Sequence, residues 1–104
     1  MVKKTSMDLQ KELSDMFSPN KVYYAPPESI KLTYPCIIFF RDYIKLEKAD
    51  NRNYSKFNRY QLTVIDRDED NPIIEAILDK YVGASYDRHY VAENLYHDVI
   101  SLYY

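Results

Sequence analysis

The densest group of side chains able to do chemistry is the acidic run from Asp66 to Asp70, which reads Asp-Arg-Asp-Glu-Asp. Alternating carboxylates of this kind ligate calcium in EF-hand loops. The run departs from that motif, because the glycine, backbone-ligand and terminal glutamate positions hold Asn71, Pro72 and Ile77. Two interpretations stay open. The run is either a looser divalent-cation site or a solvated loop whose carboxylates favour the N-terminus of a following helix.

Other reactive side chains are scarce. His89 and His97 are the only histidines, and Cys36 is the only cysteine. No nucleophile stands at a recognisable spacing from either histidine. Neighbours in a strand point to opposite faces, so His97 is not expected to pair with Asp98. Cys36 opens an apolar run that ends at Phe40, where a free cysteine acts as a small hydrophobe.

These observations argue against an enzyme. Phosphate-binding loops need several glycines, and the chain has one. We therefore expect no catalytic residue, no metal and no organic cofactor. A small hydrolase with an acidic metal site is the alternative, and it would require Asp66, Asp68 and Asp70 to converge with a histidine.

Tyrosine is the most over-represented residue type, with 12 copies among 104 residues. Its apolar ring and polar tip suit surfaces that are dry on one side and wet on the other. Aromatic residues are enriched at protein–protein interfaces, although they also fill small cores. As a set, the tyrosines point towards a protein that assembles.

The bulk numbers fit one domain over residues 1–104. The formal net charge of −2 argues against nonspecific nucleic-acid binding, which needs a clustered basic surface. The longest apolar stretch, Ile37 to Phe40, is far too short to span a membrane. Lys3 and Lys4 are not followed by an apolar signal region. The sequence predicts a soluble protein made in a cytoplasm.

Hydrophobic periodicity predicts the elements that position these side chains. The apolar stripes predict helices over 5–17 and 72–81, with Gly83 as the C-cap of the second helix. Polar residues 47–56 should form the long tip of a hairpin between two strands. The fold class is α+β, with two helices packed on an antiparallel or mixed sheet. The expected strands are 22–24, 34–46 and 57–66, with one or two final strands over 85–92 and 94–104.

Two segments carry opposite local charge. Residues 45–56 hold four basic and two acidic side chains, and residues 66–79 hold six acidic side chains against one arginine. The two segments either pair between neighbouring copies in a ring or are ordinary surface charge. The candidate interface residues are Lys45, Lys48, Arg52, Asn53, Lys56, Asp66, Asp68, Asp70 and Tyr103.

The segment Asp98–Tyr104 is expected to be tied into the sheet rather than frayed. Alternation places Ile100 and Leu102 on the core face. Val99 and Tyr103 then lie on the other face, available to a helix or a neighbouring subunit.

The segment order resembles the tail-terminator and tail-completion proteins in the neck of long-tailed bacteriophages. The resemblance covers nearly the whole chain and rests on patterns of residue type. It is carried by the helix ending at Phe17, the Tyr34-Pro35 step into a core strand, the long polar hairpin, and the return strand from Arg59 to Ile65.

The resemblance implies a structural virion protein that forms a homo-oligomeric ring, typically a hexamer. Such a ring caps the head-proximal end of the tail tube and mediates head–tail joining after assembly in the host cytoplasm. Its partners would be further copies of itself, the tail-tube protein, and the head–tail connector or neck proteins, with neither a membrane nor sequence-specific nucleic acid. DNA would pass through the ring. The alternatives are another minor tail or neck component of the same fold, and a monomeric protein- or peptide-binding module that uses an exposed sheet edge.

Overall fold

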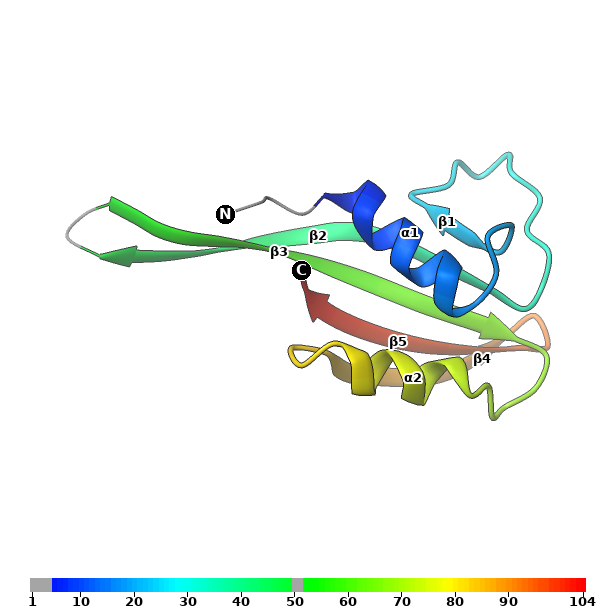
Figure 1. Cartoon of the computed structure of the whole chain (residues 1–104). Coiled ribbons are helices and arrows are strands. Elements are labelled where there is room, and N and C mark those ends of the chain that lie inside the picture. The colour runs from blue at the N-terminus through cyan, green and yellow to red at the C-terminus, as the bar shows by residue number, and fades with distance from the viewer. Residues whose placement is uncertain (1–4, 50–51) are drawn as a thin grey trace.

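Alternating and helical hydrophobic patterns produce two helices and five strands within residues 5–49 and 52–104 (Figure 1). The computed structural model describes the backbone of residues 5–49 and 52–104 and the side chains of residues 5–46 and 56–104. The expected α+β class is confirmed. The elements are α1 (Ser6–Met16), β1 (Val22–Tyr24), β2 (Cys36–Ala49), β3 (Arg52–Asp66), α2 (Ile73–Lys80), β4 (Ser85–Ala92) and β5 (Leu95–Tyr103).

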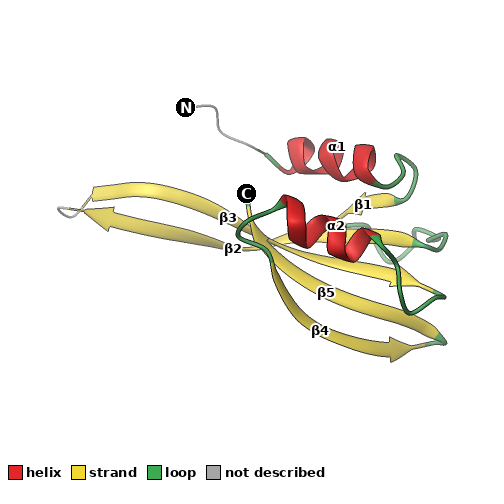
Figure 2. Cartoon of the chain, turned by 60° about the horizontal axis from the view of Figure 1, so that its bottom comes forward, coloured by secondary structure: helices red, strands yellow, loops and turns green. Residues whose placement is uncertain are grey.

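The five strands form one mixed sheet in the order β1-β2-β3-β5-β4. β1 runs parallel to β2, and the other neighbouring pairs are antiparallel. Both helices lie on the same side of the sheet (Figure 2). The sheet therefore has one helix-covered face and one face that no described helix covers.

The first helix begins at Ser6, one residue after the expected start, with Thr5 as its N-cap. The carboxylate of Asp8 accepts a hydrogen bond from the backbone N–H of Thr5 at 2.8 Å, which satisfies one of the donors left free at a helix start. Leu9 and Leu13 lie one turn apart and are fully buried. α1 is therefore held to the sheet by the apolar stripe that predicted it.

The core lies between the helices and the sheet. Alternate residues of β3, namely Tyr60, Leu62 and Val64, point into it, as the sequence predicts. Ile100 and Leu102 of β5 join them, which confirms the expected core face of that strand. Full burial of one such side chain contributes about 1.5–3 kcal/mol.

The second helix begins one residue later than expected. The side-chain oxygen of Asn71 accepts the N–H of Ile73 at 3.0 Å, so Asn71 organises the helix start and Pro72 precedes the helix. The predicted C-cap at Gly83 is wrong. The helix ends at Lys80, and Gly83 does not have the positive φ of a left-handed cap.

The helix-free face is less exposed than the alternation suggests. Cys36, Thr63, Ile65 and Val99 are buried, and they lie outside the helix-side core cluster. The register pairs Cys36 with Ile65 and Thr63 with Val99, so these four side chains pack across β2, β3 and β5. These four side chains form a buried patch on this face, beside the exposed Phe40.

The paired part of the β2–β3 hairpin is longer than predicted. Residues 47–56, expected as an irregular tip, are mostly paired strand, with Glu47 opposite Ser55 and Ala49 opposite Arg52. Polar side chains do not prevent this, because cross-strand pairing satisfies the hydrogen-bonding groups of the backbone. The connection itself lies at residues 50–51, outside the described residues.

A bulge changes the phase of β2. Arg41 pairs with Tyr60 and Tyr43 pairs with Arg59, which leaves Asp42 as the extra residue. Tyr60 and Arg59 are neighbours on opposite faces, so Arg41 and Tyr43 are on opposite faces too. Strict alternation along β2 would place Arg41 and Tyr43 on one face, and the bulge at Asp42 breaks that alternation.

Candidate assembly surfaces

The part of the hairpin beyond the body has no strand beside it among the described residues. β1 pairs with β2 only at Ile37–Phe39, and β5 pairs with β3 only from Arg59 onward. We call residues 43–49 and 52–58 the outer hairpin. At about 3.3 Å per residue, it reaches roughly 20 Å from the body.

The outer hairpin exposes apolar side chains on both faces. Tyr43 and Phe57 lie on one face, and Ile44 and Leu46 lie on the other. Their exposed fractions run from 41% for Ile44 and Phe57 to 53% for Tyr43. A two-stranded hairpin is marginally stable by itself in water. A hairpin that exposes apolar side chains on both faces, with no described helix over it, is therefore a surface that gains from a partner.

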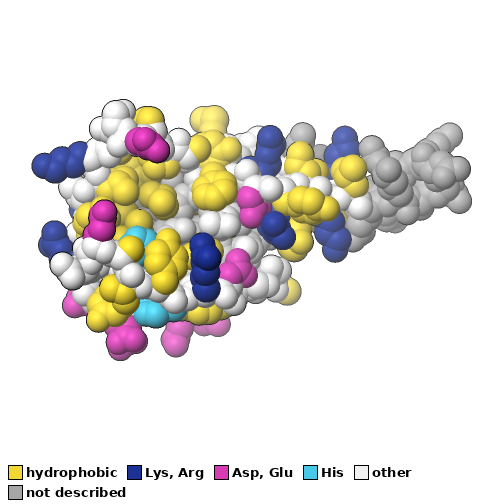
Figure 3. All heavy atoms as spheres, turned by 180° about the vertical axis from the view of Figure 1, so that it is seen from behind, with side chains coloured by type: hydrophobic (Ala, Val, Ile, Leu, Met, Phe, Trp, Pro, Cys, Tyr) yellow, Lys and Arg dark blue, Asp and Glu magenta, His cyan; other side chains and the backbone are white. Residues whose placement is uncertain are grey.

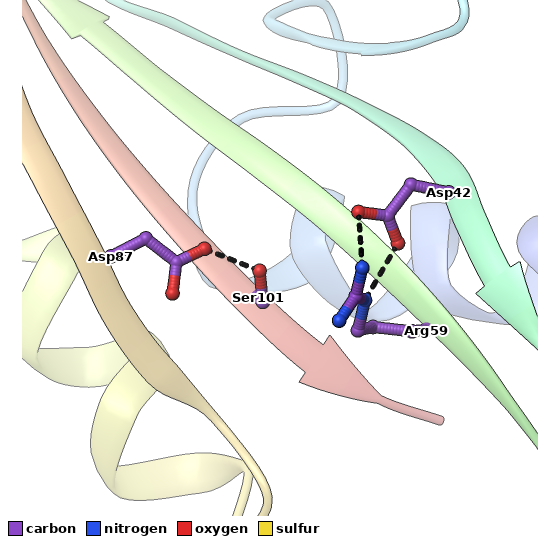
Figure 4. Close-up of polar contacts among 4 residues, drawn as sticks. All are labelled: Asp42, Arg59, Asp87 and Ser101. Atoms are coloured by element: carbon purple, nitrogen blue, oxygen red, sulfur yellow. Dashed lines mark hydrogen bonds and ion pairs between the residues drawn. The ribbon is translucent and has the colours of Figure 1, made fainter. Parts of the chain in front are cut away.

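The root of the outer hairpin is braced on the helix-free face. Arg59 donates to both carboxylate oxygens of Asp42, at 3.0 and 3.3 Å (Figure 4). The guanidinium also lies 5.1 Å from the ring centre of Tyr43. The hydrogen bonds to Asp42 raise the pKa of Arg59 above its ordinary value. The Asp42–Arg59 ion pair therefore joins β2 and β3 where the outer hairpin begins.

The predicted interface residues of the hairpin divide into two groups. The ammonium of Lys45 lies 5.6 Å from the ring centre of Tyr103, so the structure brings these two candidates together. Lys56 is exposed on the opposite strand. The backbones of Lys48, Arg52 and Asn53 are paired near the end of the hairpin. The side chains of those three residues lie outside the described part of the chain.

The helix-free face carries a second aromatic group, on β4 and β5. The rings of Tyr90 and His97 stack with their centres 4.6 Å apart, and the guanidinium of Arg88 lies 5.2 Å from the centre of the Tyr90 ring. Figure 3 shows apolar, basic and histidine side chains side by side on this face. The margin of this face is thus a mixed aromatic and cationic surface.

One residue of the acidic loop between β3 and α2, Asp66, holds the loop together by hydrogen bonds. Asp66 is half-buried, and its carboxylate accepts from Asn71 Nδ2 at 2.7 Å and from the N–H of Asp68 at 3.1 Å. Asp68 and Asp70 are exposed. Of the three candidate aspartates, Asp66 shapes the loop and the other two present charge to solvent.

A hollow of about 540 Å³ lies where this loop and the start of α2 meet β4 and β5. Glu69, Asp70 and Glu75 contribute carboxylates to its lining, which contains neither lysine nor arginine. Asp66 and Asp68 do not line it, so the aspartates required by the hydrolase alternative do not converge there. Among residues 5–49 and 52–104, no group of three or more His, Cys, Asp or Glu side chains could hold a metal ion.

Asp98 is the buried polar residue beside this hollow, with 5% of its surface exposed. It accepts a hydrogen bond from the hydroxyl of Tyr86, and His89 Nδ1 lies 2.7 Å from the same oxygen. Although 46% of the Tyr86 surface is exposed, partial burial at its contact with Asp98, and then the Asp98 carboxylate, raise the pKa of Tyr86 to about 12. His89 also stacks on Tyr96, with ring centres 5.7 Å apart. Both side chains that contact the Asp98 carboxylate belong to β4. The buried carboxylate on β5 therefore holds β4 and β5 together.

The His89–Asp98 contact is the feature that sequence reasoning missed. His97 lies on the other face, as predicted, with its Nδ1 3.1 Å from the carbonyl oxygen of Leu95. The His89–Asp98 contact follows from the two-residue turn at Glu93 and Asn94. Both residues have positive φ, as the tight turn of a two-residue hairpin requires. His89 and Asp98 are equally distant from that turn, and the register makes them direct partners.

The two charged segments occupy opposite ends of the molecule. The outer hairpin projects from one end, and the acidic loop and the β4–β5 turn lie at the other (Figure 1). The longest axis measures 51 Å, against 24 and 23 Å for the other two. This separation prevents the segments from pairing within one copy.

No protein-family model matches this chain, and no curated protein sequence matches it either. Within the described residues, no helix has the length and apolar character needed to cross a membrane.

Proposed function

We propose that the chain is a ring-forming structural protein of a bacteriophage tail, acting as a tail terminator or tail-completion protein. The observation that carries self-assembly is the outer hairpin, which exposes Tyr43 and Phe57 on one face and Ile44 and Leu46 on the other. In a ring, each hairpin would pack on the next subunit, and the contact would be heterologous.

The tail role rests on the resemblance, and the arrangement of elements supports it. A helix, a short strand, a long hairpin, a second helix and two final strands follow one another as that resemblance implies. A ring cap must contact its own neighbours, the last ring of the tail tube and the neck. The hairpin, the helix-covered side and the helix-free face are three separate surfaces available for these contacts.

The oligomeric state tests the first half of this proposal. Purified protein should sediment and scatter light as one closed species, expected to be a hexamer, with ring-shaped particles under negative stain. The double variant Leu46→Asp, Phe57→Asp should give a folded monomer, because charge at these positions opposes burial of the hairpin. The control Val82→Asp changes an apolar residue that is fully exposed outside the hairpin and should leave the ring intact. A monomeric wild-type protein would refute the proposal.

The tail role needs a second experiment. Rings added to polymerising tail-tube protein from the same virus should bind one end of the tubes and stop their growth. Tubes that elongate at the same rate in the presence of rings would reject the terminator role, and self-assembly would stand.

A second candidate function is a monomeric module that captures a peptide on an open sheet edge. β4 favours it, because this strand is at the edge of the sheet and seven of its eight residues are exposed. Light scattering separates the two candidates, since the module would be monomeric in isolation.

A further inference from the structure

β4 presents a long and regular edge. It pairs only with β5 among the described strands, and Figure 2 shows it at the margin of the sheet. From Arg88 to Ala92 every residue pairs with β5 in unbroken register, and the bulge at Asp87 affects only the first part of the strand. An open edge displays N–H and C=O groups that can pair with another strand.

This edge lacks most of the protection that edge strands usually have. The opposite edge, β1, is only three residues long and is followed within two residues by Pro26 and Pro27. β4 is eight residues long and contains neither proline nor lysine. Tyr90 and Val91 add exposed apolar surface to it. Such an edge is suited to take up a further strand.

We propose that the outer hairpin of a second copy of this chain adds to the β4 edge and continues the sheet across the subunit boundary. This inference rests on the proposed ring and names its contact. The outer hairpin suits the edge because, among the described strands, β1 pairs with β2 only as far as Phe39 and β5 pairs with β3 only from Arg59 onward. Each surface supplies the strand partner that the other lacks.

Charge complementarity favours this occupant over an unrelated peptide. β4 borders the acidic hollow, because Tyr86 and His89 line the hollow together with Glu69, Asp70 and Glu75. Segment 66–79 carries six acidic side chains and one basic one. Segment 45–56, which forms most of the outer hairpin, carries four basic and two acidic side chains. A hairpin laid along β4 brings these opposite charges together, which favours that pairing over hairpin against hairpin.

The contact is also heterologous. The hairpin projects from one end of the molecule, whereas β4 belongs to the body and leads to the opposite end (Figure 1). One copy can therefore give its hairpin to the next copy and receive a hairpin at its own β4. Contacts of this kind close into rings when the rotation between neighbours allows it.

Disulfide trapping between copies tests the contact. Cys36 is fully buried, and burial raises the pKa of its thiol to about 11, so the native thiol should not compete. Each test variant carries two new cysteines. One replaces a residue of the outer hairpin (Tyr43, Ile44, Leu46 or Phe57), and the other replaces Tyr90 or Val91 of β4. After mild oxidation, at least one pair should give a ladder of covalent multimers that ends at the ring size. The corresponding single-cysteine variants should stay uncross-linked.

The outcomes separate the contact from the ring. If a single hairpin cysteine forms efficient dimers, hairpins meet each other and the proposed contact is wrong. If light scattering shows a ring but no pair in the panel cross-links, the β4 contact is wrong and the proposed function stands. If the wild-type protein is monomeric, the proposed function itself fails. A ladder from the paired variants supports both.

Discussion

Tyr104 donates its hydroxyl hydrogen to the carboxylate of Glu12, which ties the residue after β5 to α1. The same carboxylate accepts from the hydroxyl of Tyr81 and forms an ion pair with Lys80 at 3.4 Å. The Tyr104 ring lies edge-on to Tyr60 and Tyr81, with centres 6.4 and 6.1 Å apart. Glu12 therefore joins α1 and the C-terminal end of α2 to Tyr104, the residue after β5, through one half-exposed carboxylate.

The variant Tyr104→Phe should lower the free energy of unfolding by about 1.5–3 kcal/mol, the usual contribution of a hydrogen bond to a charged group. The ring contacts survive this change, so the loss reports the hydroxyl. Tyr43→Phe is the matched control, because Tyr43 is exposed and a surface change of this kind costs less than about 0.5 kcal/mol. Urea denaturation measures both variants. Equal stability of Tyr104→Phe and wild type would show that the Glu12 contact contributes nothing.

Deletion of Ser101–Tyr104 should give insoluble or unfolded protein. It removes the fully buried Leu102 and the Tyr104 anchor together. Truncating one buried leucine costs about 2–5 kcal/mol, against a total stability of about 5–15 kcal/mol. Circular dichroism and solubility measure the outcome. A folded truncated protein would mean that β5 does not need its final residues.

The fold could be predicted from local pattern where burial enforces it. The stripe of Leu9 and Leu13 and the alternation of Leu62 and Val64 predicted the core because each residue type matches its buried face. The outer hairpin could not be read in the same way. Residues 47–49 and 52–56 show no alternation of apolar and polar types, so no pattern in the sequence marks them as strand.

The site was harder to predict because its contacts cross between elements. The Tyr86–Asp98–His89 cluster depends on the register between β4 and β5, and that register depends on a turn containing no glycine. The bulge at Asp42 is invisible to a simple period of two, yet it decides which face Tyr43 occupies. The charge asymmetry of the two segments was legible from sequence, whereas their location at opposite ends was not.

Reversing Asp68 and Asp70 to lysine should weaken assembly and reduce its dependence on salt. Both side chains are exposed and neither organises the loop, so the monomer should stay folded. Exposed charges are screened within roughly 8–10 Å at ordinary ionic strength, so the wild-type ring should loosen as salt rises. Sedimentation across a salt series measures this. The control Asp15→Lys, on the exposed side of α1, should leave assembly unchanged. If the variant with both reversals assembles with the same salt dependence as the wild type, the acidic loop carries ordinary surface charge and does not contribute to assembly.

Alkaline pH should destabilise the fold through its tyrosines. The pKa of Tyr86 is raised to about 12, by burial first and then by Asp98, and that of Tyr81 is raised by burial and Glu12. An unfolded tyrosine titrates near about 10. The unfolded state therefore loses its protons first, so the stabilisation is complete below about pH 10 and falls as pH rises towards the folded-state value.

Urea denaturation at increasing pH, with tyrosinate absorbance read in parallel, measures this dependence. Tyr86→Phe should be less stable than wild type near neutral pH, because Asp98 loses a donor, and its stability should fall less steeply above about pH 10. The control Tyr43→Phe should keep the wild-type slope, since Tyr43 is exposed and is not a partner of Asp98. If Tyr86→Phe and wild type lose stability in parallel between pH 10 and pH 12, the Tyr86–Asp98 contact does not govern the alkaline limit.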